Sequence, residues 1–445
     1  MIVMKFGGSS VRDAERIECV SEIIRQHLAR HPVIVVSALG STTNNLIAAG
    51  KAALQGRVDL TTIKQHHLKT AQDLGLSVTE IEPLFEDLEN LLKGICLLDE
   101  LSPKTLDHLV SFGERLAAII VAAYLTMCKI PAKPFNAWEL GVITNSTFGD
   151  AEISPESYDH IAAALGSLKQ CYDFTPVVTG FIAKDKNGAI TTFGRGGSDL
   201  TASLLGAALK VEEIQVWKDV DGILTTDPKI VTAARPVLEI SFEEASELAY
   251  FGAKVLHPLS MQPAMNSNIR VRVKNSYNPG HPGTIISGDP QQNGLVKAIT
   301  CKRNVTLIDI VSSRMLGQYG FLASLFQVFA KHQISVDMVA TSEISVSLTL
   351  NQEQALDAVL AELGAFSRVN LGRGKAILGI VGNIKRSSEI LDGTFNILHA
   401  HGINVQMISQ GASKVNIGLI VEDSEVELCV KELHRYFFED QRIAA

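Results

Sequence analysis

The sequence predicts an α/β fold with a mainly parallel β-sheet between layers of helices, followed by two smaller modules of the order βαββαβ. Two observations lead to this prediction. First, a strand-like run, a loop of small residues and a helical pattern follow one another from residues 2, 32 and 189. Second, residues 326–339 (FQVFAKHQISVDMV) align without a gap with residues 395–408 (FNILHAHGINVQMI). At 445 residues the chain is too long for one ordinary core, so two or three domains are expected.

Turn residues place the main domain boundary. Residues 278–294 are rich in glycine and proline, so we assign residues 1–290 to a first domain. Within it, residues 46–103 read as a helical insertion or lid, because apolar residues recur there at three- and four-residue steps. Residues 295–445 form the second region. Its modules are expected at about 305–372 and at about 376–445, the latter with a further strand near 296–301.

Composition restricts the class of partner and the compartment. The net charge of −8 argues against a nucleic-acid surface, although a local basic pocket for a phosphate remains compatible with it. Six scattered cysteines without a CxxC pair favour reduced thiols over disulfides or zinc. We find neither a charged leader segment nor an apolar run of about 18 residues. A cytoplasmic protein without a membrane span is therefore expected.

The stretch 189–231 is the first candidate site. A glycine loop at 194–197 precedes Ser198 and Asp199, which are expected at the N-cap of a helix over 200–209. A strand at 213–217 then completes a βαβ-sized span and runs into KDVDG at 218–222. Exposed glycine N–H groups and a helix N-terminus suit an anionic ligand, and ligands sit at the carboxyl ends of strands in open α/β sheets. For an isolated loop, the alternative is a tight turn without a ligand.

Two charged residues stand out in otherwise apolar surroundings. Lys5 ends the strand 2–6 beside Gly7 and Gly8, where its ammonium group and both amides would meet phosphate oxygens. An ordinary surface lysine is the alternative. Glu114 lies in an apolar helix over 106–124, where burial without a partner is costly, so it is expected to face a cation. A surface salt bridge is the alternative for this residue.

Six motifs, in order, resemble those of the aspartokinases in the amino-acid kinase superfamily. They are KFGGSSV (5–11), VSALGSTTN (36–44), SFGE (111–114), TFGRGGSD (192–199), KDVDGILTTDP (218–228) and FGAKVLHP (251–258). The resemblance covers essentially the whole chain, and the C-terminal repeat is similar to tandem ACT domains. It implies a three-layer αβα sandwich and two intertwined ferredoxin-like ACT domains. The length fits the monofunctional enzyme, and SVD (335–337) and TSE (341–343) resemble the lysine-sensitive class.

The resemblance implies transfer of the ATP γ-phosphoryl group to the side-chain carboxylate of L-aspartate. The product is 4-phospho-L-aspartate, in the first step of lysine, threonine and methionine biosynthesis. Because that carboxylate is already ionised at pH 7, catalysis reduces to alignment and neutralisation of charge. Lys5, Gly7 and Gly8 would stabilise the transferred group, and Asp199 or Asp219 would orient Lys5 or the magnesium shell. Mg²⁺ is expected to arrive with ATP, with no certain ligand from the protein.

The same resemblance assigns the substrate contacts. Arg195 offers a two-pronged match for the α-carboxylate of aspartate and Glu114 a countercharge for its α-ammonium group, with Thr43, Gly197 and Ser198 around them. ATP would lie along Lys5, Ser9, Lys218, Asp219, Leu224, Lys229 and Lys254. Four of these positions depart from the commonest family pattern: Ser9 and Lys218 replace Thr, Leu224 replaces Tyr and Lys229 replaces Arg. Leu224 lacks the aromatic ring on which a base could stack, and Lys229 lacks the bidentate guanidinium group of Arg.

The first ACT module is the expected binding site for lysine as a feedback inhibitor. Its strand carries Asp337 and continues to Ser342 and Glu343, whereas the second copy has Gln406 and then Gly411. The terminal ammonium group of lysine needs carboxylates, which only the first copy offers. The rest of the expected site is Met315, Gly320, Phe321, Leu322, Ser335 and Val336. Exposed acids at a strand end are the alternative.

Two rival functions share parts of this pattern. A glutamate or acetylglutamate kinase would share the phosphate loops, but is not expected to combine them with SFGE, GRGGSD and two ACT modules. A non-catalytic amino-acid sensor would keep the repeat without needing Lys5, Asp199 and Lys254 together. The expected assembly is a homodimer or a dimer of dimers through the ACT domains, with neither nucleic acid nor membrane as a partner.

Overall fold

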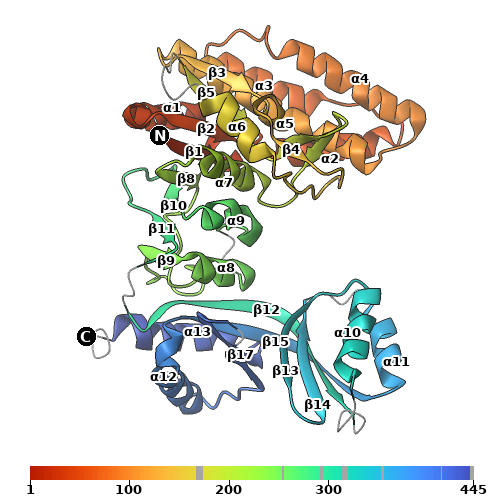
Figure 1. Ribbon diagram of the computed structural model, residues 1–445, viewed down its shortest axis with the longest axis vertical. Helices are drawn as coiled ribbons and strands as arrows, with labels where there is room; N and C mark the ends of the chain where they lie inside the picture. The colour runs from red at the N-terminus through yellow and green to blue at the C-terminus, as the bar shows by residue number, and fades with distance from the viewer. Residues whose placement is uncertain are drawn as a thin grey trace. The chain divides into compact units, whose positions relative to one another are not determined.

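The computed structural model describes residues 1–166, 174–252, 255–290, 294–312, 319–351, 355–411 and 413–440. The chain divides into two compact units (Figure 1). The first comprises Met1–Ile223, Leu238–Phe242 and Val255–Pro290, and the second comprises Leu224–Val237, Glu243–Lys254 and Gln291–Ala445. The sequence assigned all of residues 1–290 to the first domain, but Leu224–Val237 and Glu243–Lys254 belong to the second unit.

An eight-stranded sheet forms the centre of the first unit. Its order is β3 (Ala132–Phe135), β5 (Thr175–Thr179), β2 (Pro32–Val36), β1 (Ile2–Phe6), β8 (Glu213–Lys218), β10 (Arg270–Asn275), β11 (Thr284–Ser287) and β9 (Glu239–Ser241). All neighbouring strands are parallel except β10 and β11. Strands β1 and β2 are buried along their whole length, which explains why both read as unbroken apolar runs.

Helices cover both faces of this sheet, as the predicted three-layer fold requires. On one face, Ile2, Met4 and Phe6 join a single hydrophobic cluster with five helices. These are α1 (Ala14–His27), α2 (Thr42–Ala53), α3 (Thr61–Asp73), α4 (Glu82–Leu98) and α5 (Pro103–Met127). On the other face α7 (Gly197–Leu209) packs on β1, β2 and β8, with α6 (Ser157–Gly166) and α9 (Pro258–Asn266) against it. The predicted helical segment 46–103 thus shares the core of the sheet.

Helix α5 is the one described helix that is long and apolar enough to cross a membrane. Its most apolar 18-residue window has a mean hydropathy of 1.5, and 72% of that window is buried inside the structure. The helix packs against α1, α2, β3 and β5. It is therefore a central core element of the first unit.

Three local sequence predictions were wrong. Helix α7 begins at Gly197 with Gly196 at its N-cap, so Ser198 and Asp199 occupy its first turn. The strand before it, β7 (Ile190–Thr192), does not join β8 in a βαβ unit, because it pairs with β6 (Ile182–Asp185) and β4 (Ile143–Thr144) in a separate small sheet. Finally, the loop of small residues that was predicted after the strand from residue 32 ends earlier than its composition indicates: α2 begins at Thr42, so Thr43 lies in a helix.

The second unit is built on a six-stranded antiparallel sheet. Its order is β13 (Val336–Thr341), β14 (Ser345–Leu350), β12 (Val296–Val311), β15 (Arg368–Gly382), β17 (Asn416–Glu422) and β16 (Met407–Ser409). Figure 1 shows α10 (Phe321–Lys331) and α11 (Leu356–Gly364) at the β14 end, and α12 (Ser387–Ala400) and α13 (Val426–His434) at the β17 end. Helix α8 (Phe242–Tyr250) also belongs to this unit.

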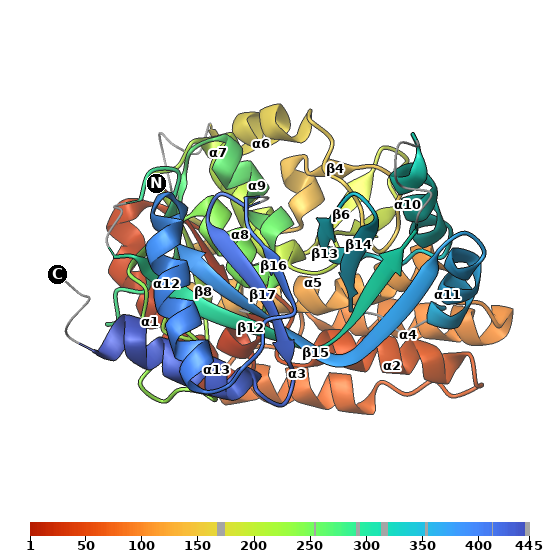
Figure 2. The ribbon, with the colours of Figure 1, turned by 90° about the horizontal axis from the view of Figure 1, so that it is seen from below.

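The two modules share their central strands. The first half of β12 pairs with the second half of β15, and the second half of β12 pairs with the first half of β15. Figure 2 shows these two long strands side by side. The predicted starts of the two modules, near residues 305 and 376, therefore lie inside strands of 16 and 15 residues, β12 and β15. Each module takes one strand from the other, which is how they are intertwined.

Candidate active site

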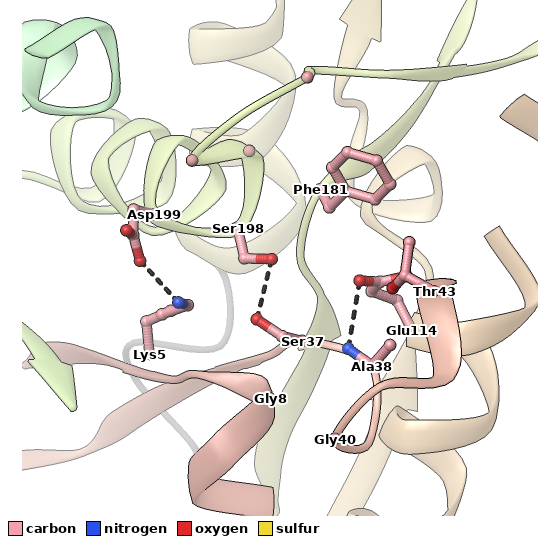
Figure 3. Close-up of a pocket in the computed structure, with 13 residues that line it drawn as sticks. Lys5, Gly8, Ser37, Ala38, Gly40, Thr43, Glu114, Phe181, Ser198 and Asp199 are labelled. Carbon is pink, nitrogen blue, oxygen red and sulfur yellow. Dashed lines mark hydrogen bonds and ion pairs between the residues drawn. The ribbon is translucent and has the colours of Figure 1, made fainter. Parts of the chain in front are cut away.

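A cavity of about 320 Å³ opens where β1, β2 and β5 end, on the side of the sheet that α7 covers (Figure 3). Loops that follow parallel strands meet at one edge of the sheet, and ligands of such folds bind there. The lining residues come from five segments of the first unit: Lys5, Gly8, Ser37, Ala38, Gly40, Thr43, Glu114, Phe181, Gly194, Gly196, Gly197, Ser198 and Asp199. The predicted catalytic and substrate residues are thus largely brought together.

Lys5 and Asp199 form a buried ion pair at one end of this cavity. The Lys5 Nζ atom lies 2.7 Å from Asp199 Oδ1, and both side chains are less than a tenth exposed. Lys218 Nζ donates to the other carboxylate oxygen of Asp199 at 3.1 Å. One carboxylate therefore holds two ammonium groups side by side at the carboxyl ends of β1 and β8.

The pKa values of this group follow from burial and charge. Burial lowers the pKa of Lys5, and the neighbouring charge of Lys218 lowers it further, while Asp199 opposes both. Burial alone would raise the pKa of the Asp199 carboxyl, but the charges and hydrogen bonds of Lys5 and Lys218 outweigh burial and lower it. Asp199 is thus held as an anion, and it keeps Lys5 in place for an anionic ligand.

Glu114 is a buried carboxyl group that has only one of its oxygens satisfied. Its side chain enters the cavity from α5, and Oε1 accepts a hydrogen bond from Ala38 N at 3.1 Å (Figure 3). In the part of the chain that the structure describes, Oε2 has no hydrogen-bond partner. Burial raises the pKa of Glu114 to about 8. The surface salt bridge that the sequence left open is therefore wrong, and the group is available to a cationic ligand.

Glycines let the loops around the cavity approach one another. A Cβ atom at Gly8 would lie 2.8 Å from the Ala38 carbonyl oxygen, so no side chain fits between these two loops. Gly196 has a φ of 76°, a conformation that glycine adopts without strain. The Gly7 N–H, which the sequence assigned to a phosphate, donates to the Trp217 carbonyl at 3.2 Å. Of these two glycines, only Gly8 belongs to the cavity lining.

Two supporting groups were missed in the sequence. Asp107, on α5, accepts hydrogen bonds from Thr192 N, Thr192 Oγ1 and Gly149 N, all at 2.8–2.9 Å, and so ties β7 to α5 just before the glycine loop. Ser37 Oγ donates to Ser198 Oγ at 3.0 Å and joins the loop after β2 to α7. The only signal for Asp107 in the sequence was its spacing: it lies seven residues before Glu114, and this spacing places both side chains on one face of a helix.

The other predicted substrate and nucleotide residues that the structure describes lie outside this cavity lining. Arg195 is exposed on the glycine loop, outside the cavity lining. Asp219 is exposed just after β8, and the Ser9 carbonyl accepts a hydrogen bond from Tyr277 Oη at 2.9 Å. Leu224 and Lys229 belong to the second unit. Lys254 lies outside the described residues.

The predicted effector residues occupy the first module of the second unit. The Asp337 carboxylate is already engaged: Tyr250 Oη donates to it at 2.6 Å, Lys302 Nζ at 3.0 Å and Asn351 Nδ2 at 3.2 Å. Its side chain is only 1% exposed. Around it, Ser335, Ser342 and Glu343 are exposed and Val336 is half-buried, while Gly320 is the N-cap of α10, with Phe321 and Leu322 in the first turn. Met315 lies outside the described residues.

Comparison with known proteins identifies the family. Residues 1–275 match the amino acid kinase family, and residues 308–362 and 378–437 match the ACT domain. Aspartokinase 1, chloroplastic, from Arabidopsis thaliana is 50% identical over 455 residues, which cover 98% of this chain and 80% of that protein. Lysine-sensitive aspartokinase 3 from Escherichia coli (strain K12) is 34% identical, with 99% of both chains covered. The chain belongs to the aspartokinase family.

Solved structures agree with this assignment. The crystal structure of E. coli aspartokinase III in complex with aspartate and ADP has a TM-score of 0.81 and 34% identity, and it covers 99% of this chain and 100% of that one. The same enzyme in complex with lysine and aspartate has a TM-score of 0.82 and 33% identity, with the same coverage. The chain is therefore an aspartate kinase, which uses a nucleotide to phosphorylate L-aspartate.

Proposed function

We propose that Lys5 is the residue that stabilises the phosphoryl group as it moves from ATP to the β-carboxylate of L-aspartate. The observation that carries this role is the buried Lys5–Asp199–Lys218 cluster at the carboxyl ends of β1 and β8. Two ammonium groups share one carboxylate, so the cluster has a net positive charge before any ligand binds. An oxyanion that enters this region gains charge-assisted hydrogen bonds without any reorganisation of the site.

Glu114 holds the α-ammonium group of aspartate in this proposal. Its free Oε2 atom is the one buried carboxylate oxygen of the cavity lining that lacks any contact within the described residues. An ammonium ligand supplies the missing hydrogen bond and the countercharge together. Thr43 and Ser198 line the same cavity and complete the pocket, while Arg195 lies on the loop beside it. The α-carboxylate is assigned to Arg195, in agreement with the chemistry of a guanidinium fork.

ATP is placed along Ser9, Lys218 and Asp219, with Leu224, Lys229 and Lys254 as further contacts of the same nucleotide. Within the described residues, no three His, Cys, Asp or Glu side chains gather as a metal centre. We place Mg²⁺ on the phosphate oxygens of ATP, where it would neutralise part of their charge. Asp219 is exposed just after β8, and it is the residue we assign to the water shell of the metal ion.

Lysine acts as a feedback inhibitor at Asp337 in this proposal. A relative at 34% identity is named lysine-sensitive, and the E. coli enzyme has been solved with lysine bound. In this chain the Asp337 carboxylate already holds an ammonium group, that of Lys302. The terminal ammonium group of free lysine has the same chemistry as the Lys302 side chain, so the effector would exchange with an internal lysine. Glu343, which is exposed, is the second carboxylate of the proposed site.

Assembly and compartment complete the proposal. We place a homodimer, or a dimer of dimers, at the ACT modules. The chain is assigned to the cytoplasm on its composition, although the three Arabidopsis relatives carry the description chloroplastic. Neither nucleic acid nor a membrane is assigned as a partner.

A single assay tests the proposed reaction. The purified protein is incubated with MgATP and either aspartate, glutamate or acetylglutamate, and the acyl phosphate is trapped with hydroxylamine. We expect trapped product with aspartate alone, and inhibition when lysine is added but not when threonine or methionine is added. Product with glutamate in place of aspartate would overturn the substrate assignment. Inhibition by threonine alone would overturn the effector assignment and leave the reaction untouched.

A further inference from the structure

A second and larger cavity lies on another face of α5. It has a volume of about 770 Å³ and is bounded by α4, α5, the short helix Ala137–Leu140 and the β6–β7 hairpin. Its α5 residues Lys104, His108, Phe112 and Arg115 follow one another at steps of four, four and three, which is one stripe of a helix. Asp107 and Glu114 each lie one residue away from this stripe, so they point about 100° around the axis, towards the active site.

Positive charge gathers in this cavity, which we call the α4–α5 pocket. Lys104, Arg115 and Lys184 line it, against the single lining carboxylate of Asp87. Across the ranges that the structure describes, none of these three cations forms an ion pair with a carboxylate. Arg115 lies instead over the Phe112 ring, 4.8 Å from its centroid, and Lys184 lies over the Trp138 ring, also at 4.8 Å. Aromatic faces thus hold Arg115 and Lys184 in position, while neither side chain has a carboxylate partner within the described residues.

Burial makes this arrangement costly without a ligand. Burial lowers the pKa of Arg115, against the opposing charges of Asp87 and Glu139. Burial also lowers the pKa of His108, and the charges of Arg115 and Lys184 lower it further, with Asp87 opposing. Arg115 and Lys184 are half-buried, and half-buried cations that form no ion pair within the described residues are unusual unless something compensates them. A bound anion would supply that compensation.

The rest of the lining indicates what kind of anion fits. His108 stacks on Phe112 with ring centroids 5.6 Å apart and an interplanar angle of 17°, and Trp138 provides a further flat surface. Asn187 and the backbone of Gly188 add polar groups from the hairpin. The volume is in the range that small-molecule sites occupy in proteins. A compact molecule with an anionic end and a flat or apolar end matches all of these features.

We propose that the α4–α5 pocket binds a small organic anion, with its phosphate or carboxylate groups against Lys104, Arg115 and Lys184 and a planar portion against Trp138. This site is separate from the aspartate cavity but shares α5 with it. The β6–β7 hairpin, which supplies Lys184, also continues into Thr192 and the glycine loop of the active site. The proposal does not depend on the assignment of the substrate residues.

Tryptophan fluorescence tests the proposal directly. The chain has two tryptophans, of which Trp217 is fully buried in the first unit and Trp138 lines the pocket. The full-length protein is titrated with citrate, a polycarboxylate, and separately with phenyl phosphate, a phosphate monoester with a planar ring. We expect a saturable change with a half-saturation below about 1 mM for at least one probe. The probe that binds more tightly distinguishes a carboxylate site from a phosphate site.

Substitutions test whether the fluorescence change arises from binding in the α4–α5 pocket. Arg115→Gln and Lys184→Gln are each expected to weaken binding about tenfold, since each removes a charge-assisted contact. Lys186→Gln is the matched control on the same hairpin, because Lys186 is exposed and pairs with Glu156 outside the pocket. Trp138→Phe is expected to remove the fluorescence change while calorimetry still detects binding. A response that sodium chloride reproduces at equal ionic strength, or one that Lys184→Gln and Arg115→Gln leave unchanged, would overturn the proposal.

Discussion

The two units each bury a carboxylate, but they differ in whether both of its oxygens have a partner. In the first, catalytic unit, Glu114 has one oxygen without a partner among the described residues, and burial raises its pKa to about 8. In the regulatory unit, Asp337 is just as inaccessible, but Tyr250, Lys302 and Asn351 satisfy both of its oxygens. An unsatisfied buried acid is unfavourable until a ligand arrives, whereas a satisfied one resists any ligand that must displace its partners.

This difference separates a preorganised site from a competitive one. In the proposed aspartate site, an ammonium group would add a contact at Glu114 and remove none. In the proposed effector site, an ammonium group at Asp337 would have to exchange with Lys302, so its apparent affinity would be reduced by the fraction of molecules in which that internal pair is formed. Tyr250, the last residue of α8, donates to Oδ1 of Asp337, whereas Lys302 contacts Oδ2.

The largest expected effect concerns the cation that completes the catalytic cluster. Lys5→Met should lower kcat by about 100-fold or more, because the lost ammonium group acts on charge that develops in the transition state. Folding should persist, since Lys218 remains as the countercharge of Asp199. Steady-state kinetics measure kcat, and a thermal melt shows whether the variant is folded. Near-normal turnover in a folded variant would show that the Lys5 assignment is wrong.

The next effect tests the unsatisfied carboxylate itself. Glu114→Gln preserves the shape of the side chain but removes its charge, so the KM for aspartate should rise about 10- to 100-fold while the KM for ATP stays constant. Initial rates with each substrate varied in turn distinguish the two constants. An equal rise in both would place Glu114 outside the aspartate site.

A third prediction removes the satisfied carboxylate. Asp337→Asn keeps a hydrogen-bond acceptor for Tyr250 but offers no charge to an ammonium group, so the lysine concentration for half-inhibition should rise about tenfold or more. Uninhibited activity should not change. Inhibition curves for both proteins give the result, and unchanged lysine sensitivity would remove Asp337 from the effector site.

Protonation of Glu114 predicts a pH dependence for aspartate binding. Below pH 8 the side chain of the empty site is mostly neutral, and a bound ammonium group must expel its proton, which weakens binding. The KM for aspartate should therefore fall by up to about tenfold per pH unit as the pH rises towards 8, and level off above it. In Glu114→Gln the same profile should be flat between pH 6.5 and about 8. A slope that survives in this variant would assign the titration to another group.

The smallest expected effect tests competition at Asp337. Lys302→Met removes the internal ammonium group, so the lysine concentration for half-inhibition should fall about fivefold. Lys331→Met is the matched control, since Lys331 pairs with Glu362 on the surface of the same module. A rise in the half-inhibitory concentration would mean that Lys302 assists the effector, and the contrast between the two carboxylates would then fail.

Much of the architecture was determined locally and is readable in the sequence. The apolar runs of β1 and β2, the small residues after them and the aligned repeat over 326–339 and 395–408 all depend on periodicity and on backbone preferences of neighbouring residues. Gly8 and Gly196 are required by close approach or by a positive φ, and both were noticed as loop residues. Such features do not depend on distant parts of the chain.

Tertiary structure alone decided which charges are paired. The order of strands in the sheet places β8 beside β1, so that Lys218 and Lys5 meet the same carboxylate on α7. The Tyr250–Asp337 hydrogen bond joins residues 87 positions apart, and no periodic pattern in the sequence predicts it. The N-cap of α7 fell at Gly196 and not at Ser198 or Asp199, because their side chains serve Ser37 and the two lysines. Local propensity sets where elements form, but a buried polar atom takes its partner from whichever segment the fold brings within hydrogen-bond distance.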